Sequence, residues 1–210
     1  MKAGNQEARR GIGGLTLCGV LVMCGFGVLG GCAHPINIAP DIAKIEQAPD
    51  AQRIETSAGY YIAAERRDLS VTTAGGGGDK VRYQPYREIE TGFYKMLTNV
   101  FKDVTLLKSP TDTEAIRKNA LNFIVTPTIS TESSSPSPFT WPPTRFTVNL
   151  SCDITDAEGK PVVNKSVVGE GMAEFDEFKA DFSLAGKRAA QEALRKMQEA
   201  LLKETPELRK

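Results

Sequence analysis

The sequence predicts an α+β fold, a single domain with a mixed, largely antiparallel sheet and two or three helices packed on one face. Residues 144–155 alternate between apolar and polar side chains, and a turn at 156–160 leads into a second strand-like run at 161–175. This is the pattern of an antiparallel hairpin. Apolar residues recur at three- and four-residue steps after Pro85 and again over 181–204, which is typical of amphipathic helices. Strand-like segments outnumber helical ones, so a sheet with helices over one face is the expected architecture.

The other expected elements are shorter. Strands are expected at 60–64, 69–73, 80–84, 104–107 and 122–131. Asp112 can cap a helix that runs to about residue 121. The four glycines at 75–78 indicate a flexible hairpin loop, because Asp79 would repel a phosphate and no helix begins there.

Composition suits one globular domain with appendages. The chain has 210 residues, of which 40% are hydrophobic, and its 26 basic side chains equal its 26 acidic ones. No overall positive field favours nucleic acid, so we expect no nucleic-acid partner.

The first residues have the pattern of a secretory signal. A basic stretch ends at Arg10, and no charged side chain follows until Asp41. The segment between them is apolar and rich in small residues, as an export signal requires. Glycine recurs through it, which disfavours the alternative of an uncleaved membrane helix.

The end of this segment, Leu29-Gly30-Gly31-Cys32, resembles the lipobox of bacterial lipoproteins. The resemblance implies that a lipid such as palmitate is attached to Cys32 and that residues 1–31 are removed as a signal peptide. Because Ala33 is not aspartate, it also implies an outer-membrane location facing the periplasm, for a Gram-negative source. An unmodified Cys32 after an ordinary signal is the remaining alternative.

Beyond Cys32 the chain divides by composition. Residues 32–58 contain three prolines and no long periodic run, so we expect a lipidated N-terminus and a flexible tether. The globular α+β domain is then expected over 59–210.

Few residues in this domain suggest chemistry. The only histidine, His34, falls in the expected tether, which leaves no histidine-based triad or metal cluster for the domain. Cys152 falls on the apolar side of the strand at 144–155 and should be a buried hydrophobe. The carboxylates between 170 and 181 lack the spacing of a calcium loop. We therefore expect no catalytic site, no cofactor and no metal.

Two segments are candidates for partner contact. The loop at 133–143 has four prolines and carries Phe139 and Trp141, the only tryptophan. Exposed aromatics there would bind a partner or a lipid interface, or the rings would fold back as a cap over the sheet edge. Tyr83, Tyr86 and Arg87 form either a recognition surface or a packed turn at a helix start.

These features predict a lipid-anchored, non-catalytic protein with an accessory or scaffolding role in an envelope assembly or transport complex. Its partners would be the membrane, through Cys32, and an unidentified envelope protein. The alternative is a lipid-anchored carrier that binds a small apolar ligand between sheet and helices. A carrier needs a sizeable apolar cavity, whereas a scaffold should be packed and expose an apolar patch.

Overall fold

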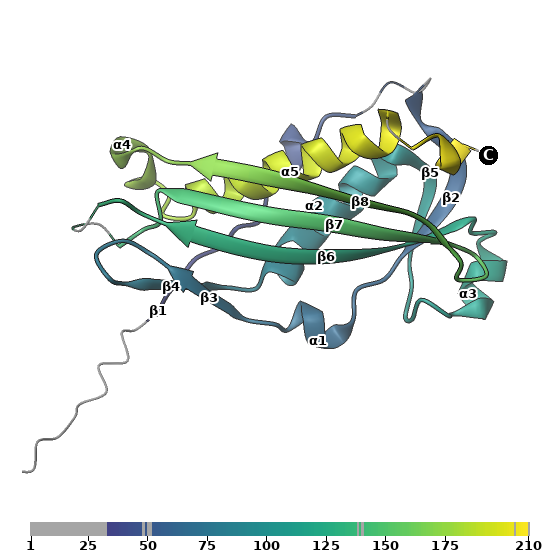
Figure 1. Ribbon diagram of the computed structural model, residues 1–210, viewed down its shortest axis with the longest axis horizontal. Coiled ribbons are helices and arrows are strands. Elements are labelled where there is room, and N and C mark those ends of the chain that lie inside the picture. The colour runs from purple at the N-terminus through teal and green to yellow at the C-terminus, as the bar shows by residue number, and fades with distance from the viewer. Residues whose placement is uncertain are drawn as a thin grey trace, which may run out of the picture. The chain divides into compact units, whose positions relative to one another are not determined.

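A five-stranded mixed sheet in the order β5-β2-β6-β7-β8 forms the centre of the fold (Figure 1). Its strands are β2 (Ile54–Tyr60), β5 (Phe101–Leu106), β6 (Phe123–Ser134), β7 (Arg145–Asp156) and β8 (Pro161–Met172). Strand β2 pairs in parallel with β5 and β6, whereas β6, β7 and β8 form an antiparallel meander. The computed structural model describes residues 33–47, 49, 52–137, 139, 141–203 and 205–209, and Cys32 and the predicted signal peptide lie outside them.

The meander follows directly from the alternating sequence. On β7 the side chains that point to one face are all buried: Phe146, Val148, Leu150, Cys152 and Ile154. The polar residues between them lie on the opposite, more accessible face. The turn from β7 to β8 contains Gly159 with a φ of 84°, a left-handed conformation that favours glycine. The predicted hairpin is confirmed.

Two long helices, α2 (Pro85–Val100) and α5 (Leu184–Lys203), cover one face of the sheet (Figure 1). Pro85 stands at the start of α2, where its missing N–H costs nothing. The described part of the chain contains no helix that is both long enough and apolar enough to cross a bilayer. The remaining helices are short: η1 (Ile42–Lys44), α1 (Ala64–Arg67), α3 (Thr113–Lys118), α4 (Phe175–Phe178) and η3 (Pro206–Arg209). The predicted α+β class, with helices on one face of a mixed sheet, is confirmed.

A small second sheet consists of β1 (Ala33–Pro35), β4 (Lys80–Tyr83) and β3 (Val71–Ala74), in that order. Strands β3 and β4 form a hairpin whose loop contains Gly77 and Gly78, both with positive φ. The glycine run therefore makes the expected hairpin turn.

The strand predicted at 60–64 is displaced in the structure. Strand β2 begins at Ile54 and ends at Tyr60, and residues from Ala64 onward form the short helix α1. Hydrogen-bonded neighbours on both sides, β5 and β6, give β2 its strand conformation although its sequence does not alternate.

The prediction of a flexible tether over 32–58 is wrong for its described part. Ala33–Pro35 pairs with β4, and Ile54 onward belongs to the central sheet. Residues 36–47, which we call the N-terminal strap, bury Ile36, Ile38 and Ile45 in the core. These isolated isoleucines have no local periodicity, but they pack against elements that are distant in sequence.

The strap is held between α2, through Glu88, and α5. The Glu88 carboxylate accepts hydrogen bonds from the backbone N–H of Ile38 and of Gln84, both at 2.8 Å. Burial raises the pKa of Glu88, and the two backbone hydrogen bonds oppose that rise. The strap is thereby fixed to the start of α2. On its other side, a Cβ added at Gly186 of α5 would lie 2.4 Å from Ile38 Cγ2, so strap and helix are in close contact.

Candidate functional site

Three rings from distant parts of the chain pack together at one end of the domain. The centre of the Trp141 ring lies 4.2 Å from the centre of the His34 ring, at an interplanar angle of 24°. It lies 4.9 Å from the centre of the Phe182 ring. His34 comes from β1, Trp141 from the β6–β7 loop, and Phe182 from the segment before α5. The Trp141 side chain is partly buried against the core.

The glycine loop positions Trp141. The N–H of Gly76 donates to the Trp141 carbonyl at 2.8 Å, and the N–H of Gly77 donates to the Ser137 carbonyl at 3.2 Å. A Cβ at Gly75 would lie 2.3 Å from the Trp141 carbonyl oxygen, so any larger residue there would push the two loops apart. The hairpin loop thus supports the aromatic loop beside it.

Exposed apolar side chains lie at this same end of the sheet. Phe139 is 94% exposed, Phe175 54%, Met172 51% and Phe182 46%. In Figure 1 the β6–β7 connection, the end of β8, helix α4 and strand β1 are all found at the left. We call His34, Phe139, Trp141, Met172, Phe175 and Phe182 together the aromatic end.

An open pocket of about 380 Å³ lies beside the aromatic end and shares Met172 and Phe175 with it. Pro136, Met172, Phe175 and Phe178 supply its apolar lining, and Arg145 and Glu174 lie at it as well. Lys179 Nζ lies 4.2 Å from the centre of the Phe175 ring and forms an ion pair with Asp176 at 3.2 Å.

The two aromatic residues of the loop, Phe139 and Trp141, have different environments in the structure. Trp141 packs inward as a cap, while Phe139 projects into solvent. The two alternatives weighed for this loop therefore apply to different residues. Phe175 and Met172 have no signal of their own in the sequence, because both fall in or next to a segment that is otherwise rich in charged and small residues.

Tyr83 and Tyr86 do not form the recognition surface considered above, since they are only 2% and 1% exposed. The Tyr83 hydroxyl forms hydrogen bonds with Thr131 at 2.7 Å and Thr73 at 3.2 Å. The Tyr86 hydroxyl accepts from the Ile129 N–H at 3.0 Å. These tyrosines hold the small sheet and α2 against β6, as a packed turn requires. Arg87 is exposed and pairs with Asp68.

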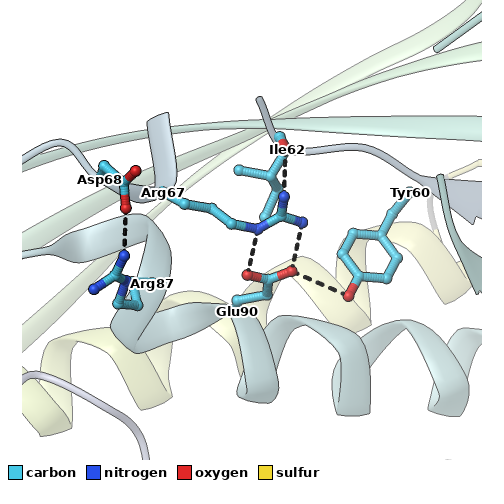
Figure 2. A network of polar contacts seen from close by, with 6 residues as sticks. All are labelled: Tyr60, Ile62, Arg67, Asp68, Arg87 and Glu90. Carbon is cyan, nitrogen blue, oxygen red and sulfur yellow. Dashed lines mark hydrogen bonds and ion pairs between the residues drawn. The ribbon is translucent and has the colours of Figure 1, made fainter. Parts of the chain in front are cut away.

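A partly buried ionic network joins α1 to α2 (Figure 2). Arg67 donates from Nε and Nη2 to the two oxygens of Glu90, at 2.7 and 2.8 Å, and from Nη1 to the Ile62 carbonyl at 2.8 Å. The Tyr60 hydroxyl donates to Glu90 Oε1 at 3.3 Å. Burial, followed by the Glu90 charge, raises the pKa of Tyr60 to about 12. Tyr60 thus stays protonated at neutral pH, and both Glu90 oxygens are occupied within the protein.

Cys152 is fully buried, as its place in the alternating strand predicted. Burial raises the pKa of its thiol, so the reactive thiolate is disfavoured. Within the described ranges, no group of three His, Cys, Asp or Glu side chains is arranged to hold a metal ion.

The contact between α5 and β8 is too close to hold a ligand. A Cβ at Gly171 would lie 2.0 Å from the Ala185 carbonyl oxygen, and one at Gly169 would lie 2.2 Å from that of Ala189. The helix backbone therefore rests directly on the strand at these two glycines. This packing gives no support to a carrier with a ligand between helix α5 and the sheet.

Comparison with known proteins yields distant structural likenesses. No family model and no curated protein matches the chain. Among solved structures, protein XCC0632 of the DUF330 family from Xanthomonas campestris is 8% identical, with a TM-score of 0.46 over 82% of this chain and 95% of that one. The PelC dodecamer from Paraburkholderia phytofirmans is 10% identical, with a TM-score of 0.42 over 75% and 94%. A minor lipoprotein from Acinetobacter baumannii is 10% identical, with a TM-score of 0.38 over 71% and 92%. Likenesses this distant carry no argument about the function of this chain.

Proposed function

We propose that the protein is an outer-membrane lipoprotein that faces the periplasm and has a non-catalytic accessory or scaffolding role in an envelope assembly or transport complex. One observation carries the proposal. The lipobox-like Leu29-Gly30-Gly31-Cys32 ends one residue before strand β1, which is paired into the folded domain. A lipid on Cys32 would therefore hold the domain close to the bilayer and in a restricted orientation.

The polar contacts of the domain support a structural protein. Glu88 fixes the strap, Glu90 is held by Arg67, and Glu177 is held by Arg188 at 2.7 Å and by its role in the capping box of α4. Each of these three carboxylates is therefore engaged in contacts within the domain.

Lipid attachment is tested by labelling with a fatty acid in a Gram-negative host. Wild-type protein should take up label and fractionate with the outer membrane, and Cys32→Ser should be unlabelled and remain as precursor. Cys24→Ser is the matched control, because this cysteine lies in the segment expected to be removed, and its label should be unchanged. Labelled and processed Cys32→Ser protein would contradict the lipobox interpretation.

The accessory role is tested by crosslinking the intact protein in its native envelope. A reproducible envelope-protein partner is the expected result. The proposal of a non-catalytic role would be overturned if the purified protein turned over a substrate and a single carboxylate substitution abolished that turnover.

A further inference from the structure

The aromatic end lies next to the proposed lipid anchor. Two peptide units separate Cys32 from His34, so their Cα atoms are no more than about 7 Å apart. His34 is fixed in β1, where it pairs with Val81, and its ring stacks on Trp141. A lipid chain attached to Cys32 would thus bring Trp141 to the surface of the same leaflet.

The side chains around that point suit a bilayer interface. Phe139 is 94% exposed, and Phe175, Met172 and Phe182 are about half exposed. Transfer of such an exposed phenylalanine side chain from water to an apolar environment is favourable, and tryptophan is favoured at the level of lipid headgroups. These residues come from the β6–β7 loop, the end of β8, α4 and the segment before α5, and Figure 1 shows these segments at one end.

Charge attraction to anionic lipid is not needed for this contact. Lys179, the basic residue next to the Phe175 ring, is paired with Asp176, so this pair adds no net charge. Arg145 and Glu174, which carry opposite charges, both lie at the same pocket. Contact through apolar side chains should therefore occur equally well with zwitterionic lipid and depend little on salt.

From these observations we infer that the aromatic end is a membrane-docking surface, which inserts Phe139 and places Trp141 at the headgroup level of the leaflet that holds Cys32. The inference rests on the proposed lipid anchor and adds to it a defined orientation. The domain then stands on its β6–β7 loop and α4, with the β7–β8 turn directed away from the bilayer.

The single tryptophan provides the test. Lipidated protein is reconstituted into phosphatidylcholine vesicles whose acyl chains carry bromine close to the headgroup, and Trp141 emission is compared with that in unbrominated vesicles. We expect quenching that salt does not reverse. Phe139→Ser should lose part of the quenching, because the loop then inserts less deeply. The matched control is Leu106→Ser, which changes a 51% exposed side chain on β5 at the other end of the sheet and should leave quenching unchanged.

Mass spectrometry of the same samples separates the two claims. Protein that lacks lipid on Cys32 would refute the anchor and this inference together. Lipidated protein with unquenched Trp141, or equal quenching in the parent and Phe139→Ser, would leave the anchor intact and overturn the docking surface. A photocrosslinker at position 139 that reacts in native envelopes with a protein and not with lipid would mean that the surface binds a protein and would also overturn the inference.

Discussion

The N-terminal strap offers a quantitative test of the fold, through Ile38→Ala. Ile38 is fully buried, with its backbone bound to Glu88 and its side chain against Gly186 of α5. The substitution removes the three carbons beyond Cβ, worth about 2.4 kcal/mol at about 0.8 kcal/mol each. The cavity left beside α5 raises the expected loss in free energy of unfolding to about 3–4 kcal/mol.

Urea unfolding of the purified protein measures this loss. For an m-value of about 2 kcal/mol/M, the midpoint should fall by about 1.5–2 M. Ile42→Ala is the control in the same strap, since Ile42 is 42% exposed, and it should change stability by less than about 0.5 kcal/mol. Equal, small effects of the two substitutions would mean that the segment is a free tether, and the described packing would be refuted.

Three further predictions follow from packing and charge. Gly171→Ala should destabilise the protein by about 1–3 kcal/mol in thermal unfolding, because the new Cβ would meet the backbone of α5; unchanged stability would contradict the close contact. The Cys152 thiol should react with a maleimide only after unfolding, since it is fully buried and its pKa is raised; rapid labelling of the native protein would contradict this. Arg188, and then the Glu174 N–H, lower the pKa of Glu177 to about 2 from an ordinary value of 4.5. The contribution of ionised Glu177 to stability is therefore present above pH 4.5 and is lost as the pH falls toward 2. The difference in melting temperature between the parent and Glu177→Gln should narrow over that range. A constant difference would refute the assignment.

The parts of the fold with a local signal could be predicted from sequence. Strand β7 alternates along its whole length, and Pro85 and Asp112 mark the starts of α2 and α3. Each of these signals depends on residues a few positions apart. The meander and the long helices were therefore predictable, and with them the α+β class.

The strap and the aromatic end have no such local signal. Ile38 is buried because Glu88, fifty residues further along, holds its backbone, and because α5 packs on its side chain. Trp141 turns inward and Phe139 outward although they are two residues apart, since the glycine loop at 75–78 binds the Trp141 carbonyl. Such positions depend on contacts between distant segments, which periodicity and composition do not encode.

The most direct test of the account is the mass of the mature N-terminus, measured on protein isolated from membranes. We predict an N-terminal peptide that begins at Cys32 and carries the added mass of a lipid. A peptide that begins at another residue, or an unmodified Cys32, would contradict the proposed anchor and the membrane orientation built on it.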